Sequence, residues 1–67
     1  MILMEKLRLE RSWSKRELAR RAGIDAALIT LAEKRGLRLY PSQLNRVAVA
    51  FEMNEEDAEK LIHKVGD

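Results

Sequence analysis

Apolar residues recur at spacings of three and four along most of the chain, and this pattern is typical of helices. Met4, Leu7 and Arg11 follow that spacing with Leu3 beside them, which predicts a first helix over about residues 2–11. The β-branched residues are scattered instead of forming alternating runs, and one proline and three glycines leave few breaks. The pattern therefore favours helices over strands.

Capping signals place the next two helices. Ser14 and Glu17 have the spacing of a capping box, in which the hydroxyl accepts from the backbone of Glu17 and the carboxylate reaches back. The second helix starts there and ends near Gly23, because glycine tolerates the left-handed conformation of a helix end. Asp25 is the next N-cap candidate, so we predict a third helix over about residues 26–34.

The second half of the chain predicts a loop around Gly36 and two more helices. The fourth helix opens at Pro41, and its apolar stripe consists of Leu44, Val47, Ala48 and Phe51. A fifth helix begins after Asn54, carries acidic residues in its first turn, and ends at Gly66. Five short helices without a linker or an internal repeat predict one compact all-α domain over residues 1–67.

Charge is divided unequally along the chain. Residues 1–38 carry ten basic and five acidic residues, a balance of +5, whereas residues 39–67 carry three basic and six acidic residues, a balance of −3. A basic half suggests a polyanionic partner, and the acidic half would keep that attraction on one side.

Length and composition exclude several classes of function. The 67 residues contain no cysteine and one histidine, so we expect no disulfide, no metal site and no cofactor. A fold of this size has no room for a large catalytic cleft, which argues against an enzyme. The longest uncharged stretch has seven residues, as in 26–32, whereas a membrane span needs about 20. We expect a soluble cytoplasmic protein without a membrane partner.

The segment from Ser14 to Ile24 predicts two short helices that cross at a tight turn. Leu18 faces inward, Ala19 is small where the next helix crosses, and Gly23 lies at the turn. Here the chain resembles the phage-repressor type of helix-turn-helix DNA-binding domain, and the resemblance covers about residues 4–58. It implies a lambda-repressor-like fold of five helices, with the helix-turn-helix motif at helices two and three, about residues 14–34.

Three features depart from the pattern of that family. Lys15 replaces a glutamine that often opens helix two, and Glu52 replaces the glycine that usually closes helix four. The seven residues between Glu33 and Pro41 also make a longer loop than usual.

In this family an arginine of helix one commonly pairs with a glutamate ending helix three, so we expect a partly buried ion pair between Arg8 and Glu33.

The resemblance also implies which residues meet DNA. The third helix would lie in the major groove and approach the bases with Ala26, Ala27, Thr30 and Leu31. The phosphate backbone would be held by Ser14, Lys15, Arg16, Lys34, Arg35 and Arg38. With Ile29 as the buried reference, Ala27, Leu31 and Lys34 fall on the outward side of the helix, so this face is mostly apolar.

Two functions remain open at this point. The first is a DNA-binding transcription regulator, which would act as a homodimer joined through the fifth helix and the tail. The second is a protein-interaction module, antitoxin-like or an adaptor, that keeps the fold and docks a partner on Ala27, Leu28 and Leu31. An exposed apolar patch of that kind often marks an interface.

Overall fold

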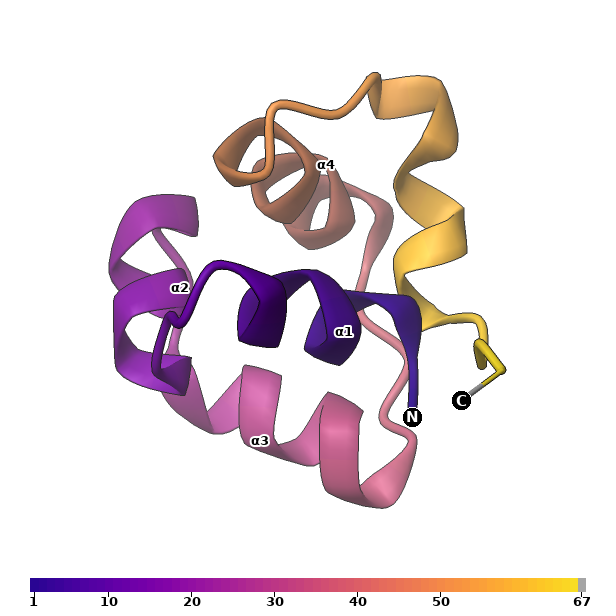
Figure 1. Ribbon diagram of the computed structural model, residues 1–67. Coiled ribbons are helices and arrows are strands. Elements are labelled where there is room, and N and C mark those ends of the chain that lie inside the picture. Colours follow the sequence, from indigo (N-terminus) through magenta and orange to yellow (C-terminus); the bar gives the residue numbers. More distant parts are fainter. Residues whose placement is uncertain (67) are drawn as a thin grey trace.

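The computed structural model describes residues 1–66, which form four α-helices followed by a 3-10 helix (Figure 1). No strand occurs among these residues, so the predicted all-α fold is confirmed. The elements are α1 (Leu3–Glu10), α2 (Lys15–Ala22), α3 (Ala26–Arg35), α4 (Pro41–Ala50) and η1 (Glu55–Ile62).

Side-chain caps start α2 and α3 at the predicted residues. The Ser14 hydroxyl accepts a hydrogen bond from the backbone N–H of Glu17, and Asp25 Oδ1 accepts one from Ala27. Gly23 follows α2 with a φ of 71°, a left-handed conformation that costs glycine little. These local bonds fix the short turn between α2 and α3.

Two non-glycine residues close α1 and α4 in the same left-handed conformation. Ser12 has a φ of 57° and Glu52 a φ of 60°. After each of them, the next backbone N–H returns to the helix: Trp13 donates to Arg8 and Met53 donates to Ala48. Helix α4 therefore ends where a glycine would end it, although Glu52 occupies the position.

The last helix differs from its prediction in type and in length. It is a 3-10 helix, begins after Asn54 without a side-chain cap bond, and ends at Ile62 instead of Gly66. Ala58 and Leu61, three residues apart, are its buried residues, and a 3-10 helix places such positions on one face. His63 is already extended, because its carbonyl accepts from Leu3 at 2.9 Å.

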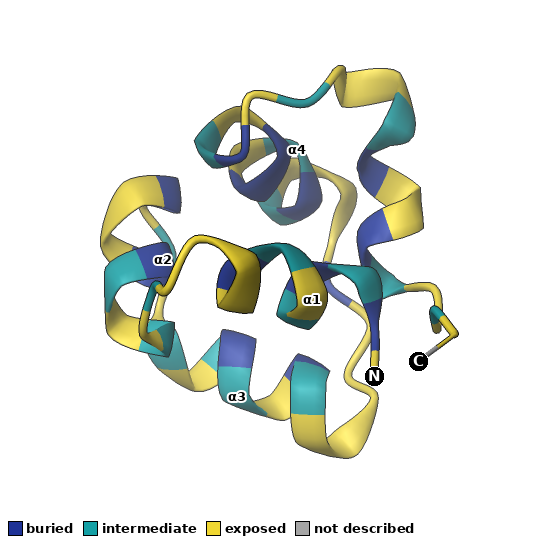
Figure 2. Ribbon diagram, in the orientation of Figure 1, coloured by how far each residue is buried: buried dark blue, intermediate teal, exposed yellow. Residues whose placement is uncertain are grey.

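The core lies where the five helices meet (Figure 2). Helix α4 packs against both α2 and η1, α2 packs against α3, and α1 packs against η1. The largest fully buried side chains come from several elements: Met4, Leu18, Ile29, Val47 and Leu61. The predicted stripe of α4 is buried throughout. This core leaves one side of α3 free.

The two ends of the described chain lie side by side (Figure 1). Ile2 and Lys64 form an isolated antiparallel bridge, and Val65 donates its backbone N–H to the carbonyl of Met1 at 2.9 Å. This contact ties the start of α1 to the segment after η1.

Candidate nucleic-acid interface

A bidentate ion pair links α1 to α3. Arg8 donates from Nε and Nη2 to the two carboxylate oxygens of Glu33, each at 2.9 Å, so the expected pair is present. Only 9% of the Arg8 side chain and 1% of the Glu33 side chain are exposed. The hydrogen bond to Glu33 raises the pKa of Arg8, against the opposing effect of burial. The pair fixes the orientation of α3 on the domain.

The free side of α3 is apolar along most of its length. Ala27 and Leu31 are exposed, as expected from the helical spacing, and Thr30 is half-buried between them. Lys34 is exposed in the last turn. If this face of α3 were inserted into a groove, the methyl group of Ala27 and the isobutyl group of Leu31 would make the first contacts.

Two residues of α3 lie deeper than the sequence suggested. Ala26 and Leu28 are partly buried and pack against the core. Leu28 also lines a shallow pocket beside the turn between α2 and α3, together with Ile24 and Gln43. The docking face expected for a protein partner therefore keeps Ala27 and Leu31 but loses much of Leu28.

Three of the residues expected to hold phosphates lie at the start of α2. Ser14 and Arg16 are exposed, and Lys15 is half-buried. The N–H groups of the first helical turn lie there as well, since a helix leaves its first donors without intrahelical partners. Within residues 1–66, Lys15 and Arg16 make no ion pair. Their charges are available to an anion.

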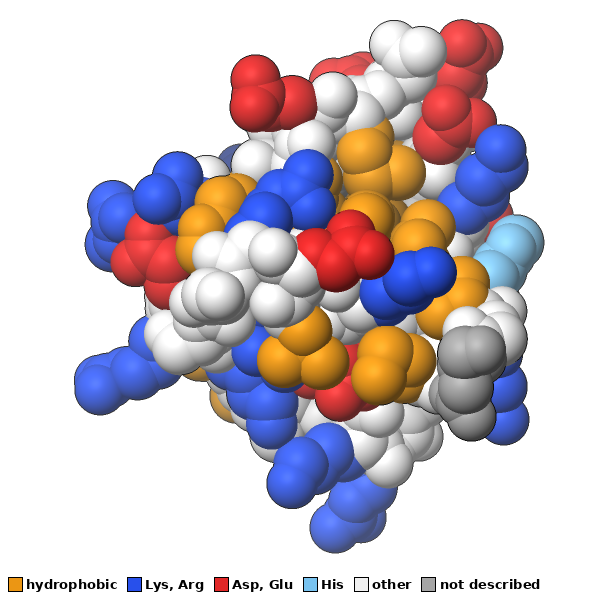
Figure 3. Space-filling view, in the orientation of Figure 1, with side chains coloured by type: hydrophobic (Ala, Val, Ile, Leu, Met, Phe, Trp, Pro, Cys, Tyr) orange, Lys and Arg blue, Asp and Glu red, His pale blue; other side chains and the backbone are white. Residues whose placement is uncertain are grey.

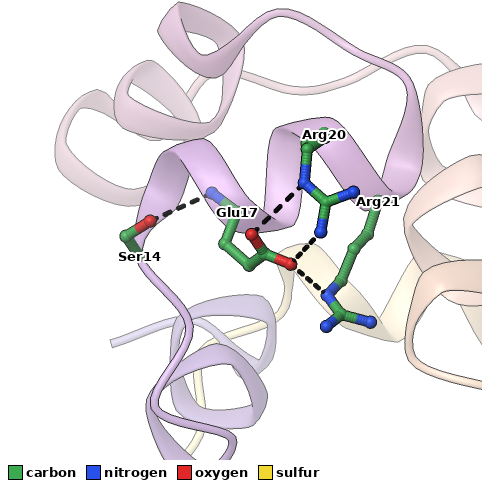
Figure 4. A network of polar contacts seen from close by, with 4 residues as sticks. All are labelled: Ser14, Glu17, Arg20 and Arg21. Carbon is green, nitrogen blue, oxygen red and sulfur yellow. Dashed lines mark hydrogen bonds and ion pairs between the residues drawn. The ribbon is translucent and has the colours of Figure 1, made fainter.

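The carboxylate of Glu17 does not close the capping box. It accepts instead from Arg20 and Arg21, one helical turn further on, with Arg21 Nε 2.6 Å from Oε2 (Figure 4). The hydrogen bond from Arg20, followed by that from Arg21, lowers the pKa of Glu17. Two basic side chains of α2 are thus partly neutralised, because charge-assisted bonds within one helix outcompete the reach back to Ser14.

Arg21 has a second neighbour. Its guanidinium carbon lies 4.4 Å from the centroid of the Trp13 ring, and Trp13 stacks on Phe51 with centroids 5.6 Å apart. Cations are attracted to the faces of aromatic rings, so this stack holds Arg21 on the domain. Trp13 immediately precedes the cap of α2, and its side chain is partly buried against the core.

The basic residues at the end of α3 and in the loop after it are not equivalent. Lys34 and Arg35 end α3, are exposed, and make no ion pair within residues 1–66. Arg38 pairs with Glu59 of η1. In Figure 3, basic side chains gather along the lower edge, over α3, whereas acidic ones lie at the top, near the start of η1. Acidic side chains also lie at the left and in the middle of this face, so the charge division along the sequence is only partly a division in space.

Sequence reasoning missed one contact that supports this surface. Arg46 of α4 donates from Nη1 to the carbonyl of Gly23 at 3.1 Å, which ties α4 to the turn between α2 and α3. No local spacing signals this bond, because the two residues are 23 positions apart. The turn is therefore held from outside as well as by its own caps.

Comparisons with known proteins agree with this geometry. A family model described as a Cro/C1-type HTH DNA-binding domain matches residues 4–64 of the chain. No curated protein and no solved structure matches. Among the described residues, no helix has both the length and the apolar composition needed to cross a membrane.

Proposed function

Since the chain belongs to the Cro/C1-type helix-turn-helix DNA-binding domains, we propose that it is a transcription regulator that places α3 in the major groove of duplex DNA. Domains of this family bind DNA and are not enzymes. The observation that carries the proposal is the free side of α3, together with basic residues at the start of α2 and at the end of α3 that make no ion pair within residues 1–66.

Phosphates on one side of the groove would meet Ser14, Lys15 and Arg16. The positive end of α2 adds to their attraction, because backbone N–H groups and the helix dipole favour an anion there. On the other side, Lys34 and Arg35 reach the backbone directly. Arg38 joins them by exchanging Glu59 for a phosphate.

Bases would face Ala27, Leu31 and Thr30, with Ala26 closer to the domain. Few of these side chains can form the bidentate hydrogen bonds that discriminate bases. Affinity therefore comes mainly from the phosphate backbone, and it depends strongly on salt.

The test is direct binding of the purified protein to a labelled duplex of about two helical turns. If six phosphates are neutralised, the association constant falls by about three decades between roughly 50 and 200 mM salt. Absence of salt-sensitive binding at micromolar protein would contradict the proposal.

A pair of charge reversals locates the interface. Lys15→Glu combined with Lys34→Glu should abolish binding while the circular dichroism spectrum stays unchanged, because both side chains lie outside the core. Lys6→Glu combined with Lys60→Glu changes the net charge equally at exposed positions of α1 and η1, outside the proposed interface. This control should bind with nearly the affinity of the parent protein.

We also propose a homodimer on DNA, because helix-turn-helix dimers bind two half-sites one helical turn apart. Among the described residues, η1 exposes no large apolar side chain, whereas Val49 of α4 is 61% exposed and Leu9 of α1 is 50% exposed. Those positions are better candidates for the contact than the last helix. Sedimentation of the protein with a two-site duplex, against a one-site duplex, measures the stoichiometry.

The protein-interaction alternative is the less favoured function. It requires the apolar face of α3 to meet a partner protein, and that face is reduced by the packing of Leu28. The DNA-binding experiment separates the two functions, since a protein-docking module would bind duplex DNA weakly and without regard to Lys15.

A further inference from the structure

We propose that α3 recognises the C5-methyl groups of pyrimidines in the major groove, so that thymine and 5-methylcytosine carry its sequence preference. The inference rests on the proposed DNA-binding function and names the chemical group that this surface reads. It follows from the chemistry of the exposed side of α3 and from the hydrogen bonds that the nearby acidic residues make within the domain.

The first half of α3 offers no long polar side chain to a base edge. Residues 26–31 read Ala-Ala-Leu-Ile-Thr-Leu, and Thr30 is the one polar residue among them. In a recognition helix the N-terminal residues contact the base edges, so these positions decide what is read. Ala27 and Leu31, both exposed, can meet only an apolar group, and the thymine methyl is the apolar group of the major groove.

The acidic residues near both ends of this segment make hydrogen bonds within the domain. An aspartate or glutamate can accept a hydrogen bond from the amino group of cytosine. However, the Glu33 side chain is 1% exposed and bound to Arg8, and Asp25 Oδ1 accepts from the backbone of Ala27. Glu33 is therefore unable to compete with the methyl contacts, and the N-cap bond holds one of the two carboxylate oxygens of Asp25 against the start of α3.

Charge complementarity identifies DNA as the occupant of this apolar face. Lys15 and Arg16 lie on one side and Lys34 and Arg35 on the other, and none of them is neutralised within residues 1–66. A polyanion satisfies these charges, whereas a second copy of the same face would bring like charges together. The C5-methyl groups of pyrimidines along the groove present an apolar surface between two rows of phosphates, which matches this arrangement.

The expected size of the effect follows from the burial of methyl groups. Removing one buried methyl-sized group lowers an association constant about fourfold. Contacts from both Ala27 and Leu31 would therefore make a thymine duplex bind roughly tenfold more tightly than the same duplex with uracil.

The experiment compares duplexes that differ only in this group. A duplex of alternating A·T pairs, about 20 base pairs long, is prepared with thymine or with uracil, which lacks the methyl but keeps every hydrogen-bonding group. A duplex of alternating G·C pairs is prepared with cytosine or with 5-methylcytosine. We expect the methyl-bearing member of each pair to bind more tightly, with the same dependence on salt.

A variant assigns the preference to α3 instead of to the stiffness of the DNA. Leu31→Ala should lower the ratio between thymine and uracil duplexes to about fourfold or less, with little loss of affinity for the uracil duplex. Leu37→Ala removes a leucine of similar exposure from the loop after α3, outside the motif, and should leave the ratio unchanged. Both positions are exposed, so both variants should fold.

The outcomes separate this inference from the proposed function. Equal, salt-dependent binding to methylated and unmethylated duplexes overturns the methyl recognition and leaves DNA binding intact. A full thymine preference in Leu31→Ala also overturns it, because the preference would then lie in the DNA. No binding to any of the four duplexes defeats the proposed function itself.

Discussion

Arg8 and Glu33 join the first helix to the third through two parallel hydrogen bonds, and Arg8 Nη1 adds a third bond to the carbonyl of Trp13 at 2.8 Å. One guanidinium thus sets both the orientation of α3 and the entry into α2. Since α3 would enter the groove, this ion pair positions the recognition helix without itself contacting DNA.

Removing one partner of this pair should destabilise the domain strongly. Glu33→Ala leaves a nearly buried guanidinium without its anion, which costs about 3–5 kcal/mol of unfolding free energy. The double variant Arg8→Met, Glu33→Leu should be clearly more stable than Glu33→Ala, because it leaves no unpaired charge. Urea unfolding measures both, with the exposed Glu10→Ala as a control within about 0.5 kcal/mol of the parent. Equal stability of the single and the double variants would contradict this account.

The titration of Glu17 should respond to its two arginines. Because Arg20 and Arg21 lower its pKa below the ordinary value of 4.5, this carboxylate stabilises the fold above that pH, and the contribution is lost as the pH falls through the lower folded pKa. Replacing both arginines by glutamine should return the pKa toward 4.5. Carboxyl-carbon NMR follows the titration, and Lys60→Gln on η1 should leave it unchanged. An unaltered Glu17 titration in the double variant would rule out the network.

The arginines of α2 should contribute unequally to DNA binding. Arg16 makes no ion pair within residues 1–66, so Arg16→Ala should reduce the slope of log K against log salt by about one unit. Arg20→Ala should change the slope by less, since Glu17 already neutralises much of that charge. Glu17→Gln should steepen the slope by releasing both of its partners. Equal slopes for Arg16→Ala and Arg20→Ala would refute this ranking.

Much of this arrangement could be predicted from the sequence because it is local or recurs in a family. Ser14, Asp25 and Gly23 act on residues two to four positions away, so their spacing predicts the turn. The link between Arg8 and Glu33 spans 25 residues, and only the resemblance to known domains suggested it.

The remaining features depend on competition between partners that the sequence does not rank. Glu17 had the spacing of a capping box, yet two arginines on the next turn hold its carboxylate. The bond from Arg46 to Gly23 and the bridge between Ile2 and Lys64 join distant segments with no spacing signal. That bridge also explains why the last helix stops at Ile62, since the residues after it pair as extended chain.

Replacing Glu52 by glycine should stabilise the domain. Glu52 holds a φ of 60°, where an L side chain is strained and glycine is not, so Glu52→Gly should raise the unfolding free energy by about 1 kcal/mol. Gly23→Ala should have the opposite effect of similar size: the added Cβ would lie 3.7 Å from Arg46 Nη1, so only the backbone conformation costs free energy. Thermal unfolding of the two variants gives both signs, and a destabilised Glu52→Gly would show that its side chain matters more than its φ.

The bridge between Ile2 and Lys64 has a consequence for chain connectivity. Because the two ends of the described chain are hydrogen-bonded neighbours, residues 66 and 1 can be joined by a short glycine linker and the chain reopened between Met53 and Asn54. This circular permutant should keep the helical circular dichroism spectrum and the DNA affinity of the parent, since neither α2 nor α3 is cut. Loss of folding in the permutant would mean that the continuity of α4 into η1 is required for the fold. Success would show that the position of α3 does not depend on where the polypeptide starts. A second copy of the domain could then be fused at the new ends, between α4 and η1.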